Sequence, residues 1–267
     1  MRTEQLKDKV LWITGASSGI GAALAKEASR RGASLVVSGR NTPALITLAE
    51  ACGPARIAIL PFNLADKEGR LEAARKALEG FGRIDCLILN AGVSQRSRFA
   101  DTSPDVFDRI METNFRASVD LARAILPGMI ERGSGAIACV SSVAGLMGAP
   151  WRTAYSASKH ALGGFFSSLR TELSGSGVHI TMIFPGFVRT AISQNALSGD
   201  GSSHGILDPL QASGQDPEVT ARKILDAIKA GKLELKVAFD PKARLGVFLS
   251  RHFPALFTKS ISRHGGL

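Results

Sequence analysis

The chain has 267 residues, 45% of them hydrophobic, and a formal net charge of +10. This composition is enough to bury one sizeable core, and no apolar run approaches the roughly 18 residues that a membrane-spanning helix requires. The N-terminus lacks the apolar stretch of a signal peptide, so we expect a cytoplasmic protein. The positive charge would suit nucleic acid, a membrane surface or an acidic partner.

The three cysteines include no close pair. Cys86 and Cys139 fall inside apolar runs, which is typical of buried thiols in a reducing compartment. Neither is accompanied by a histidine or a charge cluster, so we expect no catalytic cysteine.

The first apolar run, residues 10–14, is followed directly by a glycine-rich turn at 15–21 with the spacing Gly-x-x-x-Gly-x-Gly. A helix-forming segment and a second apolar run, residues 34–38, come next. A strand, glycine turn, helix and strand within about thirty residues form the unit that opens dinucleotide-binding folds. Such glycines let the backbone approach a pyrophosphate, and the helix N-terminus supplies free N–H groups. We therefore predict nucleotide binding here rather than a plain loop.

The alternation of strands and helices then continues along the chain. Further strands are predicted at 56–60, 85–89, 135–140 and 178–184, and further helices at 42–52, 66–80, 104–131, 154–174 and 217–231. Continuous apolar strands between helices indicate a parallel sheet covered on both faces. The predicted fold class is therefore α/β, a single-domain, doubly wound Rossmann-type sheet with helices on both faces.

The residues capable of chemistry lie just past the carboxyl ends of these strands. They are the turn at 15–21, Arg40, Asn90, Ser142 and the pair Pro185 and Gly186. Open parallel sheets bind their ligands at that edge. The sequence therefore predicts a single site to which all of these segments contribute.

Tyr155 and Lys159 are spaced to share one face of a helix. A tyrosine is a weak acid, and a fixed ammonium beside it favours the phenolate form. Taken alone, this pair could be an ordinary surface pair on a helix. Its position after the serine pair Ser141 and Ser142 favours a catalytic role.

Over about residues 6 to 240, the chain resembles the short-chain dehydrogenase/reductase family. The resemblance is carried, in identity, order and spacing, by residues 14–21, residues 90–92, Asn114, Ser142, Tyr155 with Lys159, and residues 185–186.

The resemblance implies catalytic roles for four residues. Tyr155 would be the general acid/base, and Ser142 would polarise the substrate oxygen. Lys159 would bind the nicotinamide ribose, and Asn114 would hold the water of a proton relay. Donors at the oxygen are physically reasonable, because hydride transfer to a carbonyl builds negative charge there. Ser142 is preferred to Ser141 on the family's spacing of thirteen residues before the tyrosine.

The same resemblance implies a set of cofactor-binding residues. They are Gly15, Ser17, Ser18, Gly19, Ile20, Gly21, Arg40, Asn63, Leu64, Asn90, Ala91, Gly92, Tyr155, Lys159, Pro185, Gly186, Val188 and Thr190. The second strand ends at Arg40 with no acidic residue for a ribose hydroxyl, and an arginine there suits the 2′-phosphate of NADP. We therefore expect NADP(H), although Arg40 could also be a solvated loop charge. Asn63 stands where many relatives have an adenine-contacting aspartate, and its amide can both donate and accept.

Residues 192–217 are rich in glycine and serine and long for a plain connector, which favours a functional loop. In the family this segment is the lid over the substrate. His204 within it is expected to be solvated. The family's layout gives, as candidate pocket residues, Ser94, Gln95, Val143, Leu146, Met147, Trp151 and Phe187. Most are apolar, which favours a bulky, weakly polar alcohol or ketone, although several could equally be core residues.

The predicted function is thus an NADP(H)-dependent oxidoreductase that interconverts an alcohol and a ketone or aldehyde. Two alternatives remain open: a reductase of 3-ketoacyl groups on an acidic carrier protein or CoA, and a non-catalytic NADP(H)-sensing scaffold. We expect a homodimer or homotetramer through the helices at 104–131 and 154–174, which pair across a twofold axis in the family. No metal site and no nucleic-acid partner are expected.

Residues 1–240 are predicted to form the catalytic domain, lid included, and 241–267 a basic, apolar C-terminal extension. The extension has no acidic residue, and its basic residues are Lys242, Arg244, Arg251, Lys259 and Arg263. Pro254 should divide it into two short helices. It could pack on the substrate pocket or a subunit interface, or rest as an amphipathic segment on an anionic membrane.

Overall fold

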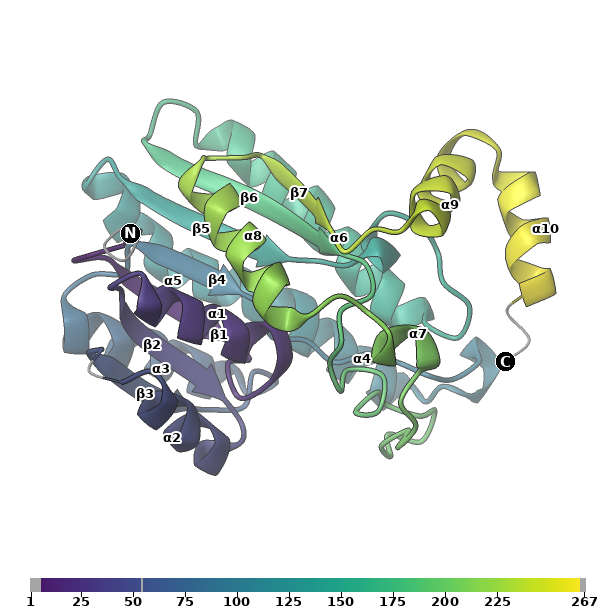
Figure 1. The fold of residues 1–267 in the computed structure, drawn as a ribbon, viewed down its shortest axis with the longest axis horizontal. Helices are drawn as coiled ribbons and strands as arrows, with labels where there is room; N and C mark the ends of the chain where they lie inside the picture. Colours follow the sequence, from purple (N-terminus) through teal and green to yellow (C-terminus); the bar gives the residue numbers. More distant parts are fainter. Residues whose placement is uncertain (1–5, 54, 265–267) are drawn as a thin grey trace.

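The protein is described by a computed structural model that covers residues 6–53 and 55–264. Its centre is a seven-stranded sheet in which every pairing of neighbouring strands is parallel (Figure 1). The strands are β1 Val10–Thr14, β2 Ser34–Gly39, β3 Ile57–Pro61, β4 Cys86–Leu89, β5 Gly135–Val140, β6 Val178–Pro185 and β7 Glu234–Val237. The predicted fold class is confirmed.

The strand order is β3-β2-β1-β4-β5-β6-β7, so the direction in which the chain crosses the sheet reverses at β1. Ile13 of β1 has Val37 of β2 as its partner on one side and Ile88 of β4 on the other. In open parallel sheets, ligands bind in the crevice at the carboxyl ends of the strands where the order reverses. The topology therefore places a binding crevice beyond the ends of β1 and β4.

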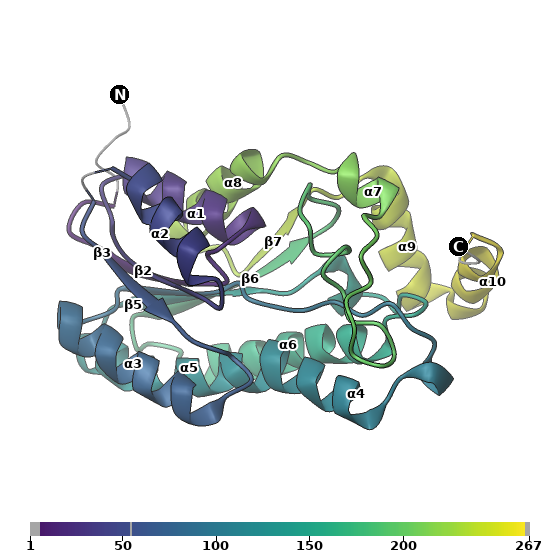
Figure 2. The same ribbon diagram turned by 90° about the horizontal axis from the view of Figure 1, so that it is seen from below.

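Helices cover both faces of the sheet (Figure 2). On one face lie α1 Gly19–Arg30, α2 Thr42–Ala51 and α8 Pro217–Lys229. On the other lie α3 Lys67–Phe81, α4 Pro104–Met111, α5 Ala117–Glu131 and α6 Thr153–Glu172. Shorter helical turns are η1 Phe99–Asp101, η3 Val143–Gly145 and α7 Pro209–Ala212.

Each face of the sheet has its own hydrophobic core, because successive side chains of a strand point to opposite faces. In β1, Trp12 belongs to the core under α3, α5 and α6, whereas Leu11 and Ile13 belong to the core under α1, α2 and α8. These three side chains are at most 2% exposed. Burial on both faces explains the continuous apolar runs of the strands.

The predicted helix starts are confirmed by capping contacts. The side chain of Asn41 accepts a hydrogen bond from Ala44 N at 3.0 Å at the start of α2. Asp66 and Asp216 cap α3 and α8 in the same way, with oxygen–nitrogen distances of 3.1 and 2.7 Å. Each cap satisfies a backbone N–H that the first helical turn leaves unpaired.

The helix predicted at 104–131 is interrupted. Between α4 and α5 the chain forms a π-helical turn, η2, at Glu112–Arg116. Such turns are rare and concentrate at functional sites. This one contains Asn114, which it holds fully buried.

Strand β7 was not predicted. It pairs with β6 at the edge of the sheet, with Leu235 opposite Ile183. Glu234 and Lys236 are exposed and alternate with less exposed residues, so the segment has no continuous apolar run. An edge strand of this kind is specified by its pairing with β6 rather than by its own composition.

Two helices follow the sheet, α9 Pro241–His252 and α10 Pro254–His264. Pro254 begins the second helix, which confirms the predicted division. In both views these helices lie at one end of the molecule, away from β3 and α2 (Figures 1 and 2). Among the residues that the structure covers, no helix has the length and apolar character needed to span a membrane.

Candidate active site

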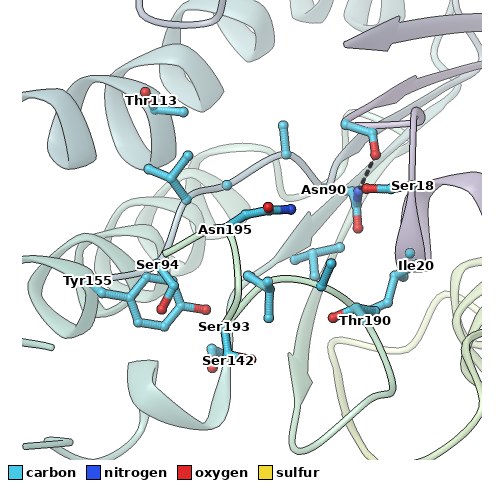
Figure 3. Close-up of a pocket in the computed structure, with 18 of the residues that line it drawn as sticks. Ser18, Ile20, Asn90, Ser94, Thr113, Ser142, Tyr155, Thr190, Ser193 and Asn195 are labelled. Atoms are coloured by element: carbon cyan, nitrogen blue, oxygen red, sulfur yellow. Dashed lines mark hydrogen bonds between the residues drawn. The ribbon is translucent and has the colours of Figure 1, made fainter. Parts of the chain in front are cut away.

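A cavity of about 660 Å³ lies at the carboxyl ends of the strands (Figure 3). It brings together most of the residues that the sequence singled out. The predicted residues that line it are Gly15, Ser17, Ser18, Gly19, Ile20, Arg40, Asn63, Leu64, Asn90, Ala91, Gly92, Ser94, Ser142, Val143, Tyr155, Lys159, Pro185, Gly186, Phe187, Val188 and Thr190.

The glycine turn after β1 forms one wall of this cavity through close backbone packing. Gly15 has a φ of +66°, and a Cβ on it would lie 2.8 Å from the Cα of Ala91. Gly21 lies outside the lining, but a Cβ there would lie 2.1 Å from the carbonyl oxygen of Gly15. Neither position can accept a side chain without movement of the backbone. The turn therefore directs the N-terminus of α1 toward the cavity, as phosphate binding requires.

Asn90 ties the end of β4 to the same turn. Its side-chain Nδ2 donates to the carbonyl oxygens of Thr14 and Gly15 at 3.0 and 3.3 Å. Its backbone N–H donates to Thr14 Oγ1 at 3.0 Å. Asn90 thus holds the two strand ends together at the cavity wall, where Figure 3 shows it beside Ser18.

Tyr155 and Lys159 lie on one face of α6, and both are largely buried, with exposures of 5% and 3%. Lys159 Nζ is 5.8 Å from the centroid of the Tyr155 ring. The ammonium also donates to the carbonyl oxygen of Val140 at 2.9 Å, at the end of β5. This bond fixes the lysine beside the tyrosine at the wall of the cavity.

The structure separates the two serines of the pair. The Ser141 hydroxyl is buried and donates to the carbonyl oxygen of Lys159 at 2.9 Å. The Ser142 hydroxyl lines the cavity and accepts from Ala144 N at 3.2 Å, which leaves its own proton available. In Figure 3, Ser142 and Tyr155 lie at the same end of the cavity. Ser142 thus has a hydroxyl proton free at the cavity, whereas the hydroxyl of Ser141 is engaged within the protein.

Asn114 lies behind the cavity wall rather than in its lining. Its Oδ1 accepts from Val93 N at 2.8 Å, and its Nδ2 donates to Val93 O and Ser158 Oγ, both at 3.0 Å. A Cβ on Gly92 would lie 3.2 Å from Asn114 Oδ1 and 3.3 Å from Lys159 Nζ. Gly92 therefore keeps open the space between the amide and the ammonium.

At the far end of the cavity, Arg40 is exposed after β2 and lines the wall together with Asn63. Asn63 Oδ1 accepts from Ala65 N at 3.1 Å, which leaves its amide N–H groups available for a ligand.

Four predicted pocket residues lie outside the lining of this cavity: Gln95, Leu146, Met147 and Trp151. Gln95 is fully buried, and its Oε1 accepts from the backbone N–H groups of Ala154 and Tyr155 at 2.9 and 3.4 Å. It therefore caps the N-terminus of α6.

Leu146 and Met147 lie outside the lining because they pack against other parts of the protein. Leu146 packs against the core under α3, α5 and α6. Met147 lies beneath α9, where a Cβ on Gly246 would be 3.0 Å from its Sδ. Trp151 has a φ of +60° immediately before α6. None of Leu146, Met147 and Trp151 therefore contributes apolar surface to the lining.

Sequence reasoning also missed residues that do line the cavity. Several come from the segment at 192–217, and they are Ile192, Ser193, Asn195, Leu197, Gly201, Ser203 and Gln211. Arg109 and Arg152 were missed as well. Arg152 stands three residues before Tyr155, which was the only local signal of its position.

The charged side chains that line the cavity are all positive. Its charged side chains are Arg40, Arg109, Arg152 and Lys159, and no aspartate or glutamate of the described residues contributes to it. The thiols take no part, because burial raises the pKa of Cys86 and of Cys139 to about 12. The cavity therefore suits anionic ligands.

Comparison with known proteins shows which protein family the chain resembles. A family model described as short chain dehydrogenase matches residues 9–200. Dehydrogenase/reductase SDR family member 7B of Bos taurus is 40% identical over 260 residues, which cover 94% of this chain and 80% of that protein.

Two solved structures share the fold. A short chain dehydrogenase/reductase from Burkholderia phymatum in complex with NAD has a TM-score of 0.84 at 23% identity, with 94% of this chain and 96% of that chain covered. A short-chain dehydrogenase from Sphingobium yanoikuyae in complex with NADPH has a TM-score of 0.75 at 26% identity, with 97% and 96% covered.

The parallel sheet, with its cavity at the point where the strand order reverses, is a Rossmann-type fold. The chain belongs to the short-chain dehydrogenase/reductase family.

Proposed function

We propose that the protein is an NADP(H)-dependent oxidoreductase that interconverts an alcohol and a ketone or aldehyde. The observation that carries the proposal is the convergence of Ser142, Tyr155 and Lys159 on one cavity that also contains the glycine turn. The test is NADPH oxidation, followed by absorbance, with ketosteroids, retinal, aromatic ketones and a 3-ketoacyl thioester as substrates. Absence of turnover with every carbonyl class, in protein that binds NADPH, would contradict it.

In the proposed mechanism, the glycine turn and Lys159 would hold NADPH, and the chemistry that it would supply is a hydride for the carbonyl carbon. Tyr155 gives its hydroxyl proton to the carbonyl oxygen, and Ser142 donates a hydrogen bond to the same oxygen as negative charge develops there. Lys159 Nζ, 5.8 Å from the centroid of the Tyr155 ring, places a positive charge beside the group that gives up the proton. Asn114 supports the wall next to Lys159, where the family's proton relay would begin.

Arg40 is the residue on which we base the preference for NADP(H). A guanidinium can hold a phosphate through two hydrogen bonds. Arg40 is exposed at the cavity wall, which Asn41 and Ser17 also line. A Cβ on Gly39, the residue before Arg40, would lie 3.1 Å from Ser17 Oγ, so Ser17 is close to the end of β2 in space. NAD as the preferred cofactor is the outcome that would overturn this assignment.

A 3-ketoacyl reductase acting on an acidic carrier or CoA remains the second candidate. The observation that favours it is the cationic lining together with the net charge of +10. A non-catalytic NADP(H) sensor is the third, and it is disfavoured because Tyr155 and Lys159 are both present and adjacent. Turnover of the 3-ketoacyl thioester well above that of the other carbonyls would select the second candidate.

Oligomerisation is proposed through α4, α5 and α6, as in the family. Ile130 of α5 is 45% exposed, which provides apolar surface for such an interface. A homodimer or homotetramer is expected, and light scattering at micromolar concentration measures it directly. A mass of one chain would contradict the proposal.

The helices α9 and α10 are proposed to rest on an anionic membrane surface, so that the protein would be cytoplasmic with a membrane-associated fraction. Leu245 and Phe248 of α9, Phe253 between the helices and Leu256 of α10 are each about half exposed, between 49% and 57%. The alternative, a tail packed on the protein, has support of its own at Ala243, which is 6% exposed. One face of α9 is thus buried against the protein at Ala243, whereas apolar and basic side chains on the rest of the helix remain exposed.

A further inference from the structure

Arg152 occupies an unusual position in the candidate active site. It is the N-cap residue of α6, the helix that carries Tyr155, and it lines the cavity. It makes no side-chain capping bond, and a cation is unfavourable at the positive end of a helix dipole. The residue before it, Trp151, has a left-handed φ of +60°, which is costly for a bulky side chain. Local stability therefore does not explain an arginine here.

The guanidinium of Arg152 is also poorly paired. Its side chain is 17% exposed, and among the described residues it makes no hydrogen bond and only one ion pair, from Nη2 to Asp208 Oδ2 at 3.6 Å. Its Nε is buried without a partner, as is that of Arg70, so the difference lies in the terminal nitrogens of the guanidinium. An arginine carries five donors, and buried donors are normally satisfied. Arg152 thus has donors left over at the wall of the cavity.

Two other buried arginines show what a structural role looks like in this protein. Arg70 donates to Leu64 O and to the carboxylates of Glu112 and Asp120 at 2.6 to 2.8 Å. Arg31 donates to Glu27 and Asp226 at 2.8 and 2.7 Å. Both have two carboxylates at hydrogen-bonding distance, whereas Arg152 has none.

Asp208 cannot supply the missing partner, because its oxygens are already engaged. Oδ1 accepts from Leu210 N at 2.9 Å at the start of α7. Oδ2 accepts from Arg96, which forms a close ion pair with it. One carboxylate is shared by two guanidiniums, so the group Arg96, Asp208 and Arg152 keeps one positive charge. Burial lowers the pKa of Arg152 and the charge of Arg96 adds to that effect, while Tyr155 and Asp208 oppose it.

This charge lies at the substrate end of the cavity. Lys159 and Arg40 are already assigned to the cofactor in the proposed function, but Arg152 and the exposed Arg109 are not. Ser94 and Ser193 line the cavity together with Tyr155 and Ser142, and apolar residues such as Phe187 and Leu197 line it as well. The uncompensated positive charge therefore favours a substrate that carries an acidic group over one that is wholly apolar.

We propose that Arg152 binds an anionic oxygen group of the substrate, a carboxylate or a phosphate, and that the preferred substrate is an acidic ketone or alcohol. The inference rests on the proposed function, since it assigns the substrate class of that same site. A guanidinium can hold either anion through two parallel hydrogen bonds. Arg152 and Tyr155 are three positions apart, so the acidic group and the carbonyl would be separated by a short spacer.

The test compares matched ketones with NADPH as the reductant. The carboxylate arm pairs 5-oxohexanoate with its methyl ester, and the phosphate arm pairs the phosphate monoester of 5-hydroxy-2-pentanone with the free keto alcohol. The measured quantity is the ratio of kcat/KM for the anionic member to that for the neutral member. We expect a ratio of about tenfold or more in at least one arm, as a charged hydrogen bond provides. The arm with the larger ratio identifies the anion.

Three variants assign this ratio to Arg152. Arg152→Gln should lower it by about tenfold or more, and Arg152→Lys should retain part of it, because an ammonium keeps the charge but not the paired geometry. Arg98→Gln removes an exposed arginine outside the lining and should keep the full ratio. A purely structural Arg152 would lower both members of a pair equally. An unchanged ratio in Arg152→Gln, or a wild-type ratio near one in both arms, overturns the proposal.

A binding measurement separates this proposal from the proposed function. Hexanoate and pentyl phosphate, which cannot be reduced, are titrated calorimetrically into the protein with NADP⁺ present. Weaker binding to Arg152→Gln than to wild type would support the anion site even if no ketone were reduced, in which case the proposed function alone would fail. Turnover of neutral ketones with equal binding to both proteins would keep the function and overturn the anion site.

Discussion

The two ends of the cavity are built by different means. The proposed cofactor end is formed by backbone packed against backbone, as where Gly21 approaches the carbonyl oxygen of Gly15 and Gly15 approaches Ala91. The substrate end is formed by side chains from the start of α6 and from the segment at 192–217, including Arg152 and Ser193. Backbone packing leaves almost no room for substitution. Side chains can be exchanged with the fold kept, so specificity for the substrate can change while cofactor binding persists.

Helix α6 and its N-cap residue contribute side chains to both ends of the cavity. Lys159 faces the shared centre of the cavity, and Arg152 stands at the other end of the same helical face. The reacting group, Tyr155, lies between them in the sequence. Variants at the centre should therefore have the largest effects, and variants at either end should change one ligand only.

The largest effect is expected at the centre. Tyr155→Phe keeps the ring but removes the titrating hydroxyl, so kcat for carbonyl reduction should fall by about 10²-fold or more. NADPH binding and thermal unfolding should stay close to wild type, which a fluorescence titration and calorimetry can check. Near-normal turnover in this variant would remove the proposed mechanism.

At the cofactor end, Gly21→Ala should disturb the backbone contact directly. The added methyl would lie 2.1 Å from Gly15 O, so we expect a loss of about 1–3 kcal/mol in the free energy of unfolding and weaker NADPH binding.

The matched control for this variant is Gly80→Ala in α3. No atom lies within 4 Å of a Cβ at Gly80, so this variant should gain about 0.5–1 kcal/mol and bind NADPH normally. Equal NADPH affinity in the two variants would show that the turn is not the binding element.

Arg40→Ala should affect cofactor choice alone. If the guanidinium binds the 2′-phosphate, the wild type should prefer NADPH to NADH by about tenfold or more, and the variant should lose most of that preference. The comparison of kcat/KM for the two cofactors measures it. A preference that survives in Arg40→Ala would assign the 2′-phosphate to other residues.

The smallest effect on catalysis is expected at the tail. The full chain should co-sediment with anionic vesicles at low salt, since each basic residue near the surface contributes about 1 kcal/mol. A chain ending at Asp240 should not, while its turnover of a water-soluble ketone should change little. Equal, negligible pelleting of both chains would support the packed alternative.

The elements of the fold could be predicted because their signals are local. The period of the apolar residues and the caps at Asn41 and Asp66 depend on neighbours within a few positions, and the structure shows those caps as hydrogen bonds. The glycine turn could also be predicted, since close backbone approach restricts the residue type at each position. Strand β7 had no such signal, because its stability comes from pairing with β6.

Most of the site could also be predicted from the sequence. Parallel strands bring their carboxyl ends to one edge of the sheet, so the residues that directly follow each strand meet there. Only tertiary structure decided what the individual side chains do there. Gln95 caps a helix that begins 58 residues later, and Met147 is covered by α9. Arg152 has free donors because Arg96, 56 residues before it, already holds Asp208. Contacts between residues so far apart in the sequence leave no local pattern, since they depend on how the packed elements meet.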